Sequence, residues 1–86
     1  MGYHVEIELA AAKQLRKIER QFQVRIYRTI KALADEPRPS GCVKMAGMDD
    51  SWRVRVGDYR IVYVVADSIN VVTVTKVGHR RDIYER

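Results

Sequence analysis

The residues best suited to chemistry in this sequence are three arginines that flank a Gly-Asp pair. The stretch WRVRVGDYRIVY covers residues 52–63 and contains Arg53, Arg55 and Arg60. A two-residue Gly-Asp loop between strand-like runs predicts a β-hairpin and sets the register of its strands. That register puts Arg55 opposite Arg60. Like charges directly opposite each other are destabilising, and an anion bound between them would reverse the effect.

The same register predicts which hairpin residues face the core. The other predicted pairs are Val56–Tyr59, Val54–Ile61, Arg53–Val62 and Trp52–Tyr63. Opposed residues share a face, so the core face carries Trp52, Val54, Val56, Tyr59, Ile61 and Tyr63. A solvated sheet face could explain Arg53 alone. The three arginines together favour a phosphate site, because guanidinium donors form a planar fork that matches phosphate oxygens.

A third strand, VVTVTKV, is predicted after the turn ADSIN at residues 66–70. A five-residue turn would pair Val65 with Val71 and place Lys76 beside Arg60. A four-residue turn would put Lys76 on the core face. We expect the five-residue turn, because burying an unpaired lysine is costly.

The stretch VGHRRDIY, residues 77–84, follows this strand with groups poorly suited to a core: His79, Arg80, Arg81 and Tyr84. We expect it to bend along the rim of the basic face. His79 could exchange a proton near neutral pH, and Tyr84 could stack on a base or donate its hydroxyl. Purely structural roles are equally good alternatives for both: an exposed strand end for His79 and a plug over the sheet edge for Tyr84.

These residues include no metal-ligand cluster, paired carboxylates, Ser-His-Asp set or Gly-rich phosphate loop. The reaction they support best uses a nucleophile already in the substrate, such as the 2′-hydroxyl of RNA. That reaction needs cations that stabilise charge on phosphorus, a proton carrier and a surface that holds the nucleotide. We expect no metal and no cofactor.

The elements that position these groups begin with an alternating run, residues 3–9, which predicts an antiparallel strand with one buried face. Tyr3, Val5, Ile7 and Leu9 are on its apolar side. The period then changes to that of an amphipathic helix, with apolar residues at Ala11, Leu15, Ile18 and Phe22.

A second helical pattern, Ile26, Ile30 and Leu33, continues to about Asp35. A break at residues 21–24 would make a helical hairpin, and one long bent helix is the alternative. The prolines and glycine of DEPRPSG end the helices. Residues 36–51 are predicted to be mostly loop, with a short strand at CVKM.

Bulk composition is consistent with one α+β domain spanning residues 1–86. The net charge is +5, and eleven of the sixteen basic residues are arginine, which favours a nucleic-acid partner or an acidic protein. The single cysteine, Cys42, cannot form an internal disulfide. Together with the lack of an N-terminal signal segment, it leads us to expect a cytoplasmic protein.

WRVRVGDYRIVY followed by VGHRRDIY resembles the RelE/ParE toxin superfamily, and more closely its RelE-like ribonuclease branch. The resemblance runs from the first strand through the helices that end in EPRP to the last motif. It implies an N-terminal strand, a helical hairpin and a three-stranded antiparallel meander, in one twisted sheet with the helices on one face. It also implies a toxin that cleaves mRNA in the ribosomal A site without a metal, and a RelB-like antitoxin that holds it inactive.

The resemblance carries functional roles to five positions: Arg53, Arg55, Arg60, Arg80 and Tyr84. The best understood relatives have lysine in place of the first two, and one of those lysines is proposed as the general base. Arginine is a poor base.

We therefore add His79 as a proton carrier. We predict catalytic roles for Arg60, Arg80, His79 and Tyr84, and RNA binding by Arg53, Arg55, Lys76 and Arg81. Two alternatives are a ParE-like poison of DNA gyrase and an inactive RNA-binding relative.

Overall fold

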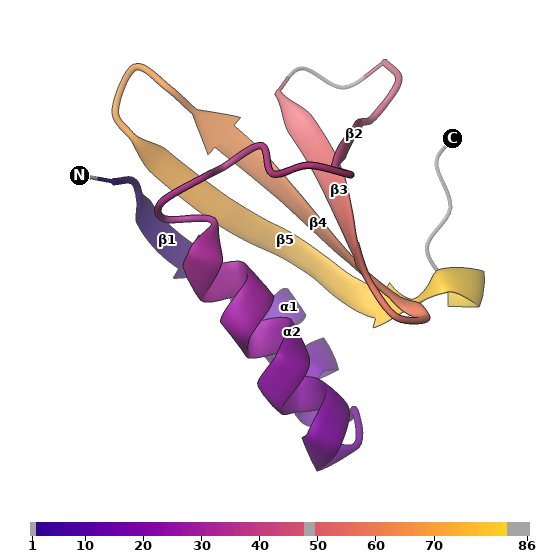
Figure 1. Ribbon diagram of the computed structural model, residues 1–86. Coiled ribbons are helices and arrows are strands. Elements are labelled where there is room, and N and C mark those ends of the chain that lie inside the picture. Colours follow the sequence, from indigo (N-terminus) through magenta and orange to yellow (C-terminus); the bar gives the residue numbers. More distant parts are fainter. Residues whose placement is uncertain (1, 48–49, 83–86) are drawn as a thin grey trace.

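The computed structural model describes residues 2–47 and 50–82, which form a mixed five-stranded sheet with a helical hairpin on one face (Figure 1). The elements in chain order are β1 (His4–Ile7), α1 (Leu9–Arg16), α2 (Arg20–Ala32), β2 (Val43–Lys44), β3 (Ser51–Val56), β4 (Tyr59–Ala66), β5 (Val71–His79) and the 3-10 turn η1 (Arg80–Asp82). The strand order across the sheet is β1-β5-β4-β3-β2. The predicted α+β fold and the short strand β2 are confirmed.

The first strand pairs with the last one in parallel, from His4 opposite Val71 to Ile7 opposite Val74. The prediction of an antiparallel first strand is therefore wrong. Alternation along β1 shows that one face is buried, but the alternation is the same for either strand direction. Leu9, which was expected on the apolar side of the strand, begins α1 and is 68% exposed.

The two helices are separate, and the break between them lies at residues 17–19 instead of the predicted 21–24. The side chain of Gln23 stabilises this break. Its amide donates to the carbonyl of Ile18 at 2.6 Å and to that of Arg16 at 3.3 Å. A glutamine from the next helix thus satisfies carbonyls at the end of α1, which is why no Gly or Pro is needed there.

The second helix ends at Ala32, three residues before the predicted Asp35. No helix in the described residues is long and apolar enough to cross a membrane.

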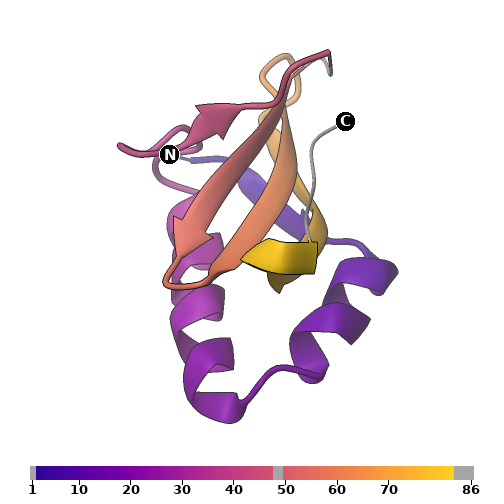
Figure 2. The same cartoon turned by 90° about the vertical axis from the view of Figure 1, so that its right-hand side faces the viewer.

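The core lies between the hairpin and one face of the sheet (Figure 2). Ala11, Ile26 and Ile30 from the helices pack there on buried sheet residues, which include Val54, Val56, Ile61, Tyr63, Val65, Val72, Val74 and Val77. The predicted core face of the β3–β4 hairpin is confirmed. Tyr63 is fully buried, and its hydroxyl donates to the Pro37 carbonyl at 2.8 Å. Burial is the main cause that raises the pKa of Tyr63.

The β4–β5 turn occupies residues 67–70 and pairs Val65 with Val72, so the predicted five-residue turn and the Val65–Val71 pair are wrong. The shorter turn is possible because Asn70 adopts a left-handed conformation, with φ of 56°.

A β-bulge between Val62 and Tyr63 then shifts the register. Lys76 lies opposite Val62 and Gly78 opposite Arg60. Val62 also pairs with Arg53, so Lys76 lies on the same sheet face as the arginines, as predicted. The residue opposite Arg60 is Gly78, however, and not Lys76. An extra residue in one strand reverses the face of everything beyond it.

A polar network joins three segments at the far end of the sheet from the β3–β4 turn. Arg38 binds Asp67 through two hydrogen bonds, of 2.7 and 3.3 Å, and the Tyr3 hydroxyl donates to Asp67 at 2.7 Å. The Arg38 guanidinium, with Tyr3 as the second cause, holds the pKa of Asp67 below its ordinary value. The network ties the residue before β1 and the loop after α2 to the β4–β5 turn.

Candidate nucleic-acid interface

The β3–β4 hairpin gathers three arginines on the sheet face away from the helices. Arg55 pairs directly with Arg60, and Arg53 pairs with Val62, which confirms the predicted register. Their side chains line a hollow of about 210 Å³, whose remaining lining residues are Gly41 and Val43. These two residues come from β2 and the loop before it, and the sequence offered no signal for them beyond a predicted short strand.

Arg60 is at the electrostatic centre of this group. Its pKa is lowered, first by burial and then by the positive charges of Arg55, Arg53 and Arg80, while Asp58 acts in the opposite direction. Arginine nevertheless stays protonated in proteins. The three neighbouring guanidinium groups therefore oppose the positive charge of Arg60, and a bound anion would offset that effect.

Among the described residues, no carboxylate forms an ion pair with Arg55 or Arg60. Arg55 donates through Nε to the Gly57 carbonyl at 3.2 Å, and Arg60 donates through Nη1 to the Tyr59 carbonyl at 3.3 Å. These bonds orient the guanidinium groups without neutralising them.

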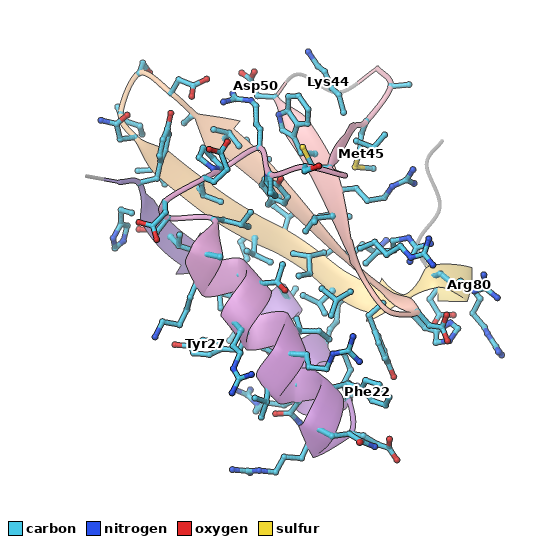
Figure 3. The ribbon with its side chains drawn as sticks, in the orientation of Figure 1. Phe22, Tyr27, Lys44, Met45, Asp50 and Arg80 are labelled. Carbon is cyan, nitrogen blue, oxygen red and sulfur yellow. The ribbon has the colours of Figure 1, made fainter. Side chains whose placement is uncertain are left out.

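The last motif joins this group through Arg80. Its backbone N–H donates to the Asp58 carbonyl at 2.7 Å, which fixes η1 against the β3–β4 turn. Figure 3 shows the Arg80 side chain beyond the end of β5, near that turn. Its Nε lies 3.9 Å from an Asp58 carboxylate oxygen, and both side chains are mostly exposed, so this ion pair is weak.

The other predicted RNA-binding residues differ in how closely they approach the hollow. Lys76 is exposed on the same face, opposite Val62, and Arg81 is exposed in η1. Tyr84 lies outside the described residues. The structure thus brings together Arg53, Arg55, Arg60 and Arg80.

His79 lies on the other side of the sheet. Strand β5 continues two residues beyond its predicted end at Val77, so His79 shares the helix-side face with Val77. It pairs with Tyr59, and the two rings meet edge to face with centroids 5.5 Å apart. It lines a separate cavity of about 440 Å³ with residues of the helical hairpin, among them Gln14 and Lys17.

The positive excess of the chain is concentrated elsewhere, on the helical hairpin. Residues 9–33 contain one acid, Glu19, and seven cations, all of them exposed: Lys13, Arg16, Lys17, Arg20, Arg25, Arg28 and Lys31. The hairpin thus carries +6, against +5 for the whole chain, so the rest of the chain carries −1. The arginine cluster of the sheet is therefore a local feature that total charge could not have revealed.

Within the described part of the chain, no group of three or more His, Cys, Asp or Glu residues is arranged to hold a metal ion. The groups that the hollow offers a ligand are guanidinium donors. Such a site can bind an anion and stabilise negative charge that develops on it.

Comparison with known proteins identifies the family. A sequence model described as ParE toxin of type II toxin-antitoxin system, parDE, matches residues 5–84. An Escherichia coli protein described as a RelE-like toxin is 30% identical over 89 residues, covering 98% of this chain and 92% of that protein.

Solved RelE structures have the same fold. RelE in the Pyrococcus horikoshii RelE–RelB complex is 29% identical, with a TM-score of 0.82, covering 93% of this chain and 97% of that one. A chain of the intact E. coli RelBE toxin-antitoxin complex is 28% identical, with a TM-score of 0.79, covering 98% of this chain and 99% of that one. The protein therefore belongs to the RelE/ParE superfamily of toxins from type II toxin-antitoxin systems, as its two arginine-rich motifs indicate.

Proposed function

We propose that this toxin is a RelE-like endoribonuclease that cleaves mRNA on the ribosome. The observation that supports this most directly is the convergence of Arg53, Arg55 and Arg60 on one hollow, with Arg80 close enough to lower the pKa of Arg60. Four guanidinium groups, with no cluster of metal-binding side chains in the described part of the chain, suit a phosphodiester whose own 2′-hydroxyl is the nucleophile.

In the proposed reaction the ribose 2′-oxygen attacks the adjacent phosphorus, and the bond from phosphorus to the 5′-oxygen breaks. The 2′-hydroxyl proton is lost and the leaving 5′-oxygen gains one, so the products are a 2′,3′-cyclic phosphate and a 5′-hydroxyl. Negative charge builds up on the phosphorane oxygens, where Arg60 and Arg80 stabilise it. Arg53 and Arg55 hold the neighbouring backbone.

The arginines of the hollow are poor bases at neutral pH. We therefore assign the rate enhancement to charge stabilisation and to alignment of the 2′-hydroxyl with the leaving group. Tyr84 keeps its predicted role, which is to stack on or orient the nucleotide.

Two partners follow from the same proposal. RelE relatives have been crystallised with RelB antitoxins, and we infer that a RelB-like antitoxin neutralises this toxin. The second partner is the ribosome, where the +6 hairpin would contact ribosomal RNA phosphates while the hollow engages mRNA in the A site. This places its action in the cytoplasm.

A ParE-like activity against DNA gyrase is the second candidate, because the matching family model is the one described as ParE toxin. A brief induction of the protein in cells separates the two. Primer extension would show mRNA ends within translated codons if it is the ribonuclease. DNA breaks trapped on gyrase, with intact mRNA, would instead establish the ParE-like activity and refute the nuclease.

A further inference from the structure

We propose that His79 is a positioning residue: its neutral imidazole caps the turn Arg80–Asp82 and thereby sets Arg80 beside Arg60. This inference rests on the proposed function of the arginine hollow. It gives His79 a role on the helix side of the sheet, where the structure places it, instead of the proton transfer expected from sequence.

The capping contact is a hydrogen bond from the backbone N–H of Arg81 to Nδ1 of His79, at 3.3 Å. His79 ends β5 immediately before η1, so it occupies the N-cap position and Arg81 the second position of the turn. The first N–H groups of a helical turn have no partner within it, and a capping side chain commonly accepts from this position. His79 therefore takes the N-capping role that Asn, Asp, Ser or Thr usually has.

The cap matters for Arg80 because it is one of two hydrogen bonds that attach the backbone of η1 to the end of the sheet. The N–H of Arg80 is held by the Asp58 carbonyl at 2.7 Å, and the next N–H along the chain is held by His79. Without the second bond, η1 could turn about the first one. Among the described residues, the largely exposed Arg80 side chain is held only by a long contact to Asp58.

The cap is available only to the neutral ring, because a protonated imidazole carries hydrogen on both nitrogens and cannot accept. The ring is half-buried against Tyr59. Charged or titratable groups around it come from the loop between the helices, from β4, from β5 and from η1: Lys17, Glu19, Tyr59, Lys76, Arg81 and Asp82. A proton on Nδ1 of His79 would make that atom a donor facing the Arg81 N–H, and the hydrogen bond that caps the turn would be lost.

Two substitutions separate the cap from the ring packing. In His79→Asn, the side-chain oxygen stands where Nδ1 stood, one atom beyond Cγ, so the acceptor is kept and the ring is lost. In His79→Phe, the ring can still pack against Tyr59 but the acceptor is lost. Circular dichroism and thermal melts would confirm that both variants are folded.

The first readout, amide hydrogen exchange by NMR, does not depend on activity. We expect the Arg81 amide to be protected in the wild type and in His79→Asn, and to exchange at least about fivefold faster in His79→Phe, the factor that loss of a typical cap produces. Equal protection in all three proteins would overturn the proposal, whether or not the protein is a nuclease.

The second readout is cleavage of mRNA on programmed 70S ribosomes. We expect kcat to fall by up to about fivefold in His79→Phe, with KM little changed, and to be retained in His79→Asn. A low rate in His79→Asn with a normal rate in His79→Phe would show that ring packing matters and would overturn the cap. If the wild type cleaves nothing, the proposed function fails, and the exchange data still decide whether His79 caps the turn.

Discussion

Arg55 lies directly opposite Arg60 in the β3–β4 hairpin, on the sheet face that the helices leave uncovered. Among the described residues neither of the two arginines pairs with a carboxylate. Repulsion between these charges should lower stability, whereas in the proposed function the same charges bind a phosphate. Stability and activity should therefore respond in opposite directions when this pair is changed.

The first prediction concerns that trade-off. Arg55→Thr should raise the free energy of unfolding by about 0.2–1 kcal/mol, because a directly opposed like-charge pair is removed and threonine suits a strand. RNA affinity should fall at the same time. Urea denaturation and filter binding would measure the two effects. A double-mutant cycle provides the control: in an Arg60→Thr background the gain in stability should largely disappear. An equal gain in both backgrounds would show that charge repulsion across the pair is not its cause.

Removal of a transition-state donor should have a far larger effect on rate than on folding. Arg60→Ala and Arg80→Ala should each lower the rate of mRNA cleavage by about 100-fold or more, the size expected for loss of one such donor. Single-turnover assays on programmed ribosomes would measure this. The matched control is Arg38→Ala, which removes an arginine from the far end of the sheet and should leave the rate unchanged at temperatures where the protein is folded. Full activity in both Arg60→Ala and Arg80→Ala would refute the assignment.

The hydrogen-bond network around Asp67 predicts how the stability of the folded protein depends on pH. The Arg38 guanidinium, and then the Tyr3 hydroxyl, hold the pKa of Asp67 below its ordinary value of 3.8. The folded state therefore binds the proton less readily than the unfolded chain, so the contribution to stability is present above pH 3.8 and is lost as pH falls through the lowered value. Thermal melts between pH 2 and pH 6 should show a shallower acid dependence in Asp67→Asn than in the wild type. Parallel curves would contradict this role for Asp67.

The buried hydroxyl of Tyr63 should matter for stability and not for chemistry. Tyr63→Phe leaves the Pro37 carbonyl without its donor, and we expect a loss of about 1–2 kcal/mol in the free energy of unfolding. Tyr27→Phe is a suitable comparison, because Tyr27 is 49% exposed on the outer side of α2 (Figure 3) and should change stability little. Chemical denaturation of the two variants would test this. Equal stabilities would mean that the Pro37 carbonyl finds another partner.

The hairpin that carries the site could be predicted from the sequence because Gly57-Asp58 allows essentially one pairing of the strands around it. Once that pairing is set, period-two alternation decides the face of each arginine and each core residue. The predicted positions were therefore most accurate for Arg53, Arg55 and Arg60, which depend only on this local geometry.

The predictions failed where distant or irregular contacts decide the outcome. The direction of β1 depends on pairing with a strand more than sixty residues away, which alternation does not report. The β-bulge near Val62, which nothing in the sequence indicates, places Lys76 opposite Val62 instead of beside Arg60. Strand β5 is two residues longer than predicted, so His79 lies on the helix side of the sheet. The helix break was misplaced because the Gln23 side chain, and not a glycine, satisfies the end of α1.

The place of β5 in the sheet has a consequence for biosynthesis. Strand β5 is an interior one, between β1 and β4, so β1 cannot begin to pair with it before synthesis has reached Val71 and cannot pair fully before Val74. A nascent chain can form its helices early, but it cannot close the sheet, and Arg80 is added only after β5 is complete. Such long-range pairing folds slowly compared with local contacts. If the proposed activity is correct, the toxin becomes active only after Arg80 has been added and β5 has paired with β1, which limits its chance to attack the ribosome that is translating it.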